Sequence, residues 1–257
     1  MIDPLYTLSG FGVGALVGMT GVGGGSLMTP LLVLLFGIHP ATAVGTDLLY
    51  AACTKSFGAM VHGRSRTVDW TVTRRLAAGS LPAAAVTLLV VNFAHIDLAV
   101  VSRVITPALA VTIGATALLL VFQTPLLRVL GPVSARLSPG RLRALTVASG
   151  AVLGLLVTVT SVGAGALGVS VITLLYPKLP VERVVGSDIS HAIPLTLLAG
   201  LGYWYLGAID WALLGSLLSG SVPGIIVGSL LATRIPRPVI RGMLAVTLTV
   251  VAARLLL

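Results

Sequence analysis

The chain has 257 residues, of which 56% are hydrophobic and only 9% are charged, and its mean hydropathy is +1.08. Soluble domains carry about 25% charged residues, so this composition excludes a soluble globular protein and predicts an integral membrane protein. The formal charge of +9 does not indicate nucleic-acid binding, because the basic residues cluster in short loops that orient membrane helices. The single cysteine, Cys53, excludes an intramolecular disulfide and a cysteine-cluster metal site.

Apolar segments follow one another along the whole chain, each near the roughly 20 residues that cross a bilayer. In the first half they cover residues 5–20, 25–37, 41–62, 70–92 and 97–122. A polar, arginine-bearing stretch follows at 123–143, and the second half has apolar segments at 144–160, 165–177, 181–206, 210–232 and 238–257. The pattern predicts an all-α membrane protein with a first membrane repeat (1–122), a cytoplasmic connector (123–143) and a second membrane repeat (144–257).

The two halves share short motifs at a nearly constant spacing. GVGGGSL at Gly21 aligns with SVGAGAL at Ser161, 140 residues later. VGTDL, Asp69-Trp70 and GSLP then align with VGSDI, Asp210-Trp211 and GSVP, each 141 residues later. A single alignment of the two halves that recovers four local matches indicates an internal duplication, which is common among secondary transporters.

The glycine-rich motif lies in a segment, 5–37, that is too long for one membrane span and too short for two. It predicts a re-entrant hairpin, because non-helical backbone at membrane depth is tolerated only beside protein or a wet cavity. With such hairpins, 13 of the 16 basic residues fall in loops on one side, as the positive-inside tendency requires. Each half then has one re-entrant helical hairpin and three transmembrane helices, so we expect two inverted repeats with both termini outside.

The hairpin tips are candidate anion sites, because a helix begins near each tip. The first turn of a helix presents unpaired N–H groups and a partial positive charge. The candidate binding residues are Gly23, Gly24, Gly25 and Ser26 in the first copy, and Gly163, Gly165 and Ala166 in the second. The alternative is that glycines only allow close helix packing. We favour packing for two other series, Gly10, Gly14 and Gly18, and Gly220, Gly224 and Gly228.

Asp47, Lys55, Asp188 and His191 are ionisable residues inside apolar segments, where such groups usually face a cavity or a partner. Lys55 is expected either to bind the anion beside the tips or to extend toward the nearby basic loop. Asp47 and Asp188 are equivalent in the two copies, and we expect them either to cap the neighbouring hairpin or pair with an arginine, or to carry protons. His191 lies one helical turn after Asp188 and is a second candidate for proton coupling, or a buried histidine with a structural partner.

The motifs GVGGG, SLMTPLL, VGT, HG and VDW, repeated more loosely in the second half, resemble the TauE/SafE family of sulfite and organosulfonate exporters. The resemblance covers nearly the whole chain. It implies a carrier of small anions in the bacterial inner membrane, coupled to protons and without a cofactor. The family's glycine signature falls on Gly21, Gly23, Gly24 and Gly25, with Gly163 and Gly165 as its counterpart.

Three other functions remain as alternatives at this point. An anion channel could use the same tips to line a pore, and a carboxylate carrier could use the same fold. An intramembrane enzyme or a subunit of a membrane complex is disfavoured, because the sequence has no cofactor domain, no metal-binding spacing and no credible pair of nucleophile and base. We therefore expect a transporter with a small anion, protons and the lipid bilayer as its partners.

Overall fold

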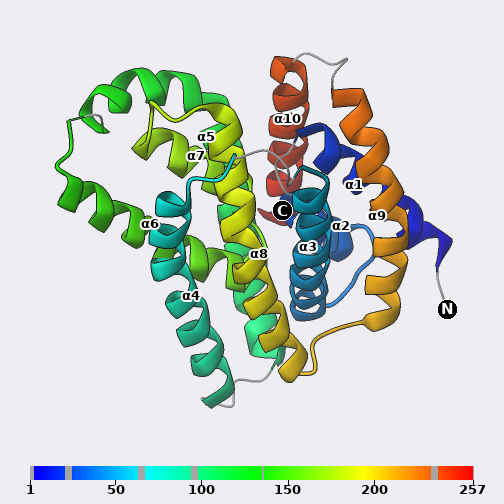
Figure 1. Cartoon of the computed structure of the whole chain (residues 1–257). Coiled ribbons are helices and arrows are strands. Elements are labelled where there is room, and N and C mark those ends of the chain that lie inside the picture. The colour runs from blue at the N-terminus through cyan, green and yellow to red at the C-terminus, as the bar shows by residue number, and fades with distance from the viewer. Residues whose placement is uncertain are drawn as a thin grey trace.

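The computed structural model describes residues 3–20, 25–62, 67–93, 98–134, 136–232 and 237–256, and their regular secondary structure is entirely helical (Figure 1). In chain order the helices are α1 (Pro4–Thr20), α2 (Gly25–Leu34), α3 (Pro40–His62), α4 (Trp70–Phe93), α5 (Leu98–Ser134), α6 (Pro139–Thr160), α7 (Ala166–Leu175), α8 (Val181–Tyr205), α9 (Trp211–Ala232) and α10 (Arg237–Leu256). Each predicted apolar segment coincides with one of them. The all-α expectation is therefore confirmed.

Helix lengths differ from the prediction around the middle of the chain. α5 does not end at 122 but continues to Ser134, and α6 begins at Pro139, so most of the predicted connector is helical. Ser138 caps α6 by accepting a hydrogen bond from the Arg141 N–H. α6 has 22 residues and is one of the five helices among the described residues that are long and apolar enough to cross a membrane, whereas α7 has only 10. The arm that the sequence predicted to be short is therefore long enough to span the membrane by itself, and the re-entrant geometry stays a prediction.

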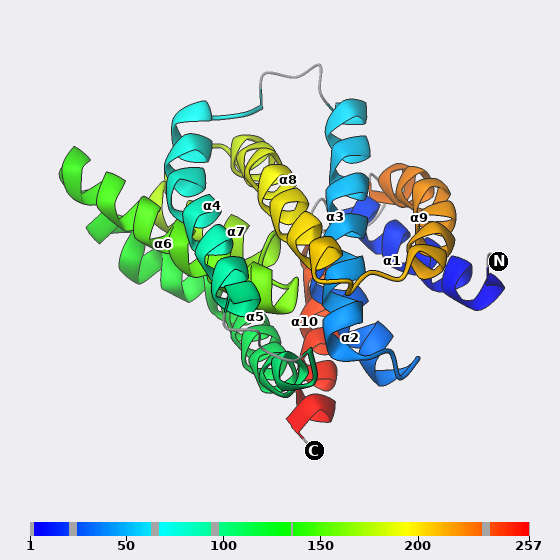
Figure 2. The ribbon, with the colours of Figure 1, turned by 90° about the horizontal axis from the view of Figure 1, so that it is seen from below.

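The helices form two groups that each combine both copies (Figure 1). α4, α5, α6, α7 and α8 make up one group, and α1, α2, α3, α9 and α10 make up the other, an arrangement that Figure 2 shows from below. Within the groups, α4 packs on α6 and α1 on α9, while α3 against α8 and α5 against α10 join the groups. Each copy thus contributes helices to both groups.

Glycines allow the closest of these helix contacts, between α1 and α9 and between α4 and α6. A Cβ at Gly10 would overlap the carbonyl oxygen of Leu217, and a Cβ at Gly150 would overlap that of Leu76. Leu217 is the repeat mate of Leu76, and Gly150 is that of Gly10. The same backbone contact is found at Gly14, Gly220, Gly224 and Gly228, which confirms the predicted packing role for these glycines.

The Asp-Trp motifs begin α4 and α9, and each is tied to the other copy. The side chain of Asp69 accepts hydrogen bonds from the first turn of α4, and that of Asp210 accepts one from α9. The Asp69 N–H donates to Ser187 Oγ at 2.8 Å, and the Asp210 N–H donates to Thr46 Oγ1 at 3.1 Å. Aligned residues in the two copies therefore make reciprocal contacts.

The repeat mates α3 and α8 pack antiparallel at the centre of the molecule. Gly45 near the start of α3 contacts Tyr203 near the end of α8, and Leu49 contacts Gly200. Many large apolar side chains on the outer helices are exposed, such as Phe93 and Val111. Exposed apolar surface of this extent is expected for a protein surrounded by lipid.

Candidate anion-binding site

The second tip is a tight, buried turn between α6 and α7. Ser161 ends α6 in the left-handed region with a φ of 57°, and Gly163 and Gly165 have φ values of 118° and 141°. Such angles favour glycine because a Cβ would clash with the backbone. α7 then begins at Ala166 with no side-chain cap on its first turn. The candidate residues Gly163, Gly165 and Ala166 therefore lie together at an uncapped helix N-terminus, within a stretch that is buried throughout.

The first tip lies largely outside the described residues. This applies to Gly23 and Gly24, together with Gly21 and Val22 before them. Gly25 and Ser26 are placed in the first turn of α2, as predicted. From Leu27 to Pro30 the helix is buried, so α2 enters the core of the protein directly after the tip.

Lys55 connects the first copy to the tip of the second copy. Its side chain is only 4% exposed, and its Nζ donates a hydrogen bond of 2.5 Å to the carbonyl oxygen of Ala164. The lysine does not extend toward the basic loop, which was one of the two expectations. Instead a positive charge lies at the glycine tip, one residue before the N-cap of α7.

Asp47 attaches α2 to α3. The carboxylate is fully buried and accepts hydrogen bonds from the backbone N–H of Thr29, at 3.1 Å, and from its hydroxyl. The side chain of Ser161, in the second tip, lies near the same carboxylate. Oδ1 of Asp47 accepts no hydrogen bond from any described residue. Asp47 therefore holds α2 against α3 and leaves one oxygen without a partner among the described residues.

Asp188 occupies the equivalent position in the second copy but has a different environment. Its side chain is 1% exposed and packs directly against Gly168 of α7, where an added Cβ would overlap Oδ1. That oxygen also has no hydrogen-bond partner among the described residues. Lys55 interacts electrostatically with both Asp188 and Asp47. The structure thus gathers one ammonium group and two carboxylates around the second tip.

His191 lies beside this cluster and has one hydrogen-bond partner. Its Nε2 is 2.8 Å from the hydroxyl of Ser80, and its Nδ1 has no partner among the described residues. In the other copy Tyr50 takes the place of His191, and Ser221, the mate of Ser80, lies near it. Both copies therefore have a serine at this position, and the residue that faces the serine is His191 in one copy and Tyr50 in the other.

Sequence reasoning missed four polar residues of this cluster, namely Thr29, Tyr50, Ser80 and Ser161. Two of them had a visible signal in the repeat. Ser80 belongs to the duplicated GSLP motif, and Tyr50 aligns with His191 at the spacing of 141. Thr29 and Ser161 lie in the quoted motifs SLMTPLL and SVGAGAL, but these motifs did not mark them as contacts of Asp47, because those contacts depend on how α2 and the second tip pack against α3.

A family model described as "Sulfite exporter TauE/SafE" matches residues 6–255. The chain belongs to the TauE/SafE family. It is 38% identical over 212 residues to the "Probable membrane transporter protein YjnA" of Bacillus subtilis (strain 168), a match covering 82% of this chain and 83% of the relative. It is 39% identical over 70 residues to the "Probable membrane transporter protein YunE" of the same organism, a match covering 27% of this chain and 26% of the relative.

No solved structure matches the chain. The family model and the relative that covers most of the chain agree with the composition and with the five apolar helices of spanning length. This member of the TauE/SafE family is a multi-pass bacterial membrane transporter.

Proposed function

We propose that this transporter is a secondary carrier of small oxyanions, with sulfite and organosulfonates as the first candidates. The observation that carries the proposal is the hydrogen bond from Lys55 to Ala164 at the second tip. An ammonium group beside the uncapped N-terminus of α7 suits an oxyanion, because backbone N–H groups and a point charge then act on the same ligand. The Ala164 carbonyl is a neutral acceptor, and an oxyanion in its place accepts a stronger hydrogen bond from the same ammonium group, because both partners are then charged.

The enclosure of the site supports a carrier in preference to an anion channel. Asp47, Lys55, Asp188 and His191 are all at most 4% exposed, whereas a continuous pore leaves its selective residues in contact with water. An occluded site at the centre of the protein is a state through which alternating access must pass. The carrier therefore opens to one side at a time.

The packing of α3 against α8 supports an inverted duplication as the basis of alternating access. These helices are repeat mates that run antiparallel, as the Gly45–Tyr203 and Leu49–Gly200 contacts indicate. α8 is long and apolar enough to cross the membrane, and we propose that α3 crosses beside it in the opposite direction, which would relate the two by an axis in the membrane plane as in inverted-repeat transporters. We infer that the two groups of helices rock about this central pair.

The charges at the site favour proton coupling. Lys55 faces two buried carboxylates, and an incoming anion is repelled by each carboxylate that is ionised. A proton on Asp47 or Asp188 removes that repulsion, so the anion and the proton favour each other's binding. His191, with its unpaired Nδ1, lies where it can pass a proton to this pair. We propose that proton and anion are bound together.

The test is transport by the purified protein in liposomes, with a panel of sulfite, short-chain sulfonates and short-chain carboxylates. A sulfonate stays ionised over the working pH range, so the pH dependence of its flux reflects protonation of the protein and not of the substrate. We expect saturable sulfonate flux, faster when the side holding the sulfonate is acidic, and proton entry detected by a trapped pH dye. An uncoupler should abolish the stimulation.

Each other outcome has a definite meaning. Flux of carboxylates alone retains the carrier and removes the sulfur assignment. Stimulation by acid on the opposite side shows that anion and proton compete, which contradicts joint binding. Unitary currents without saturation or counterflow identify a channel and overturn the carrier proposal.

A further inference from the structure

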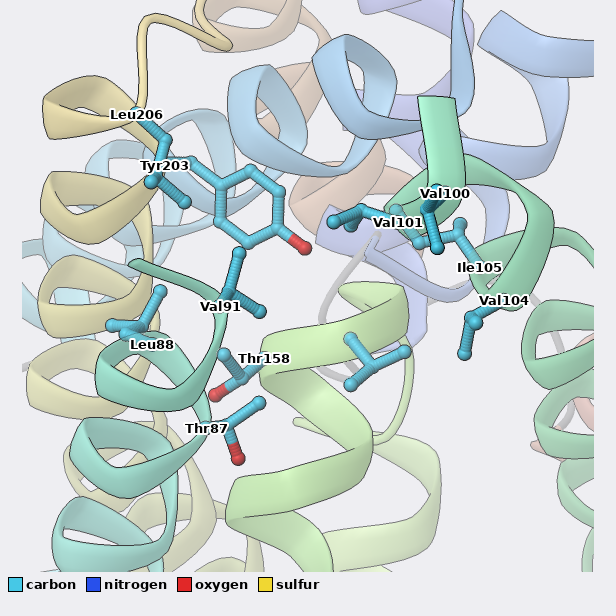
Figure 3. A pocket seen from close by; sticks show the side chains of 11 residues that line it. Thr87, Leu88, Val91, Val100, Val101, Val104, Ile105, Thr158, Tyr203 and Leu206 are labelled. Atoms are coloured by element: carbon cyan, nitrogen blue, oxygen red, sulfur yellow. The ribbon is translucent and has the colours of Figure 1, made fainter. Parts of the chain in front are cut away.

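A cavity of about 170 Å³ lies between α4, α5, α6 and α8, apart from the charged cluster (Figure 3). Figure 3 shows Val91 and Tyr203 on one side of it and Val101, Val104 and Ile105 on the other. Its floor is the last turn of α6, which includes Thr158 and leads into the second tip. The lining contains no charged side chain.

The polar side chains in the lining offer little to a polar ligand. The hydroxyl of Thr87 donates to the carbonyl of Ala83 at 2.8 Å, and that of Thr158 donates to Gly154 at 2.7 Å. Both threonines therefore satisfy their hydroxyls within their own helices. The remaining polar side-chain atom is the Tyr203 hydroxyl, which points across the cavity toward α5 (Figure 3). The chemistry of the cavity excludes a hydrated anion.

The cavity opens sideways between membrane helices. Val100 and Val104 line it, and they are 47% and 56% exposed on the outer surface of α5. α5 is one of the helices long and apolar enough to cross the bilayer, so its exposed valines face lipid hydrocarbon. An apolar cavity that stays empty loses dispersion contacts, and it does not hold water well. The medium at the opening of this cavity is lipid hydrocarbon, which can fill it.

We propose that this cavity binds one acyl chain of a membrane phospholipid. The acyl chain enters between α4 and α5, and its end lies against Thr158, in the last turn of α6. The bound lipid therefore contacts the helix turn that leads into the second tip. This inference does not depend on the identity of the transported anion.

The test uses the full-length protein in liposomes that contain a phospholipid with a photoactivatable diazirine near the end of one acyl chain. Label on the outer face of α5 reports only the surrounding bilayer. Label on Thr158 or Val159 is specific, because Thr158 is only 1% exposed and lies at the floor of the cavity. We expect peptide mapping by mass spectrometry to find label at this position.

Two matched substitutions on α5 complete the test. Val101→Trp fills the cavity and should reduce label at 158–159 by at least tenfold. Val111→Trp, at a residue of the same helix that is 68% exposed and outside the cavity, should leave that label unchanged. If Val101→Trp fails to fold, Val91→Trp fills the cavity from α4 instead.

Three results would overturn the proposal. The first is outer-face label without any label on α6. The second is undiminished label at 158–159 in the filled variants. The third is that a short-chain sulfonate removes the label at 158–159 but leaves the label on the outer face of α5 unchanged. In that case the cavity binds the apolar part of a substrate.

Discussion

The ammonium group of Lys55 in α3 donates a hydrogen bond to the carbonyl of Ala164 in the second tip, although the two residues belong to different copies of the repeat. The repeat mate of Lys55 is Thr196, whose hydroxyl bonds only within α8, to Ala192 and Ile193. Among the described residues, the lysine thus has a hydroxyl in place of a second cation at the equivalent position of the other half. We propose on this asymmetry that the anion binds at the second tip.

Replacing Lys55 tests this assignment. Lys55→Ala should raise the dissociation constant for the anion by about 10- to 100-fold, because a charged hydrogen bond contributes about 1.5–3 kcal/mol. Asp188→Asn should not weaken binding, since it removes a charge that repels the anion. Equilibrium binding to the purified protein measures both. Thr196→Ala is the matched control and should change affinity little; equal affinities in wild type and Lys55→Ala would remove the lysine from the site.

The second tip should not tolerate a side chain at Gly165. Gly165→Ala forces a non-glycine residue to a φ of 141°, which costs about 1–3 kcal/mol, and it distorts the turn that presents Ala164 to Lys55. We expect reduced transport per folded molecule together with a lower melting temperature. Gly114→Ala in α5 is the control, because nothing lies within 4 Å of its added Cβ. A transport rate in Gly165→Ala equal to the control's would contradict this role.

The packing of α1 on α9 predicts opposite effects at two neighbouring glycines. Gly10→Ala drives a methyl group into the backbone of Leu217 and should destabilise the protein by about 1–3 kcal/mol. Gly12→Ala meets nothing within 4 Å and should be neutral or stabilising by up to about 1 kcal/mol. Thermal unfolding in detergent distinguishes the two. Gly150→Ala should behave like Gly10→Ala, and a harmless Gly150→Ala would argue against equivalent packing in the two copies.

The Thr29–Asp47 contact should be visible as an interaction energy. Thr29→Val removes the hydroxyl donor, and Asp47→Asn removes the charge that both Thr29 hydrogen bonds reach. Since the groups share one buried contact, the double mutant should be more stable than the two single effects predict, by about 0.5–3 kcal/mol. A double-mutant cycle from unfolding measurements provides the value. Strict additivity would show that Asp47 does not hold α2.

Helix positions could be predicted because the signal was local. Apolar runs of spanning length and duplicated motifs placed α3 and α8 within a residue or two of their observed bounds. The extension of α5 could not be predicted, because Pro125 and Pro132 argue against a helix, yet α5 includes both. α5 packs against α7 and α10, and tertiary contacts of this kind override local preference.

Individual site residues were predictable, but their pairing was not. Asp47, Lys55, Asp188 and His191 stood out as charged or ionisable groups in apolar segments. Lys55 contacts Ala164 in the second tip and not the tip of the first copy. This pairing depends on how α3 crosses α8, which no short-range sequence pattern encodes. Ser80 was marked by the duplicated GSLP motif, whereas the hydroxyl of Thr29 was not singled out, because hydroxyl side chains are common in membrane helices.

The mixed composition of the two helix groups has a consequence for assembly. Since α4 and α5 pack with α6 to α8, and α9 and α10 pack with α1 to α3, neither copy can complete its own packing. A chain cut between α5 and α6 should therefore leave two fragments that fold only when they are expressed together, each supplying helices to both groups.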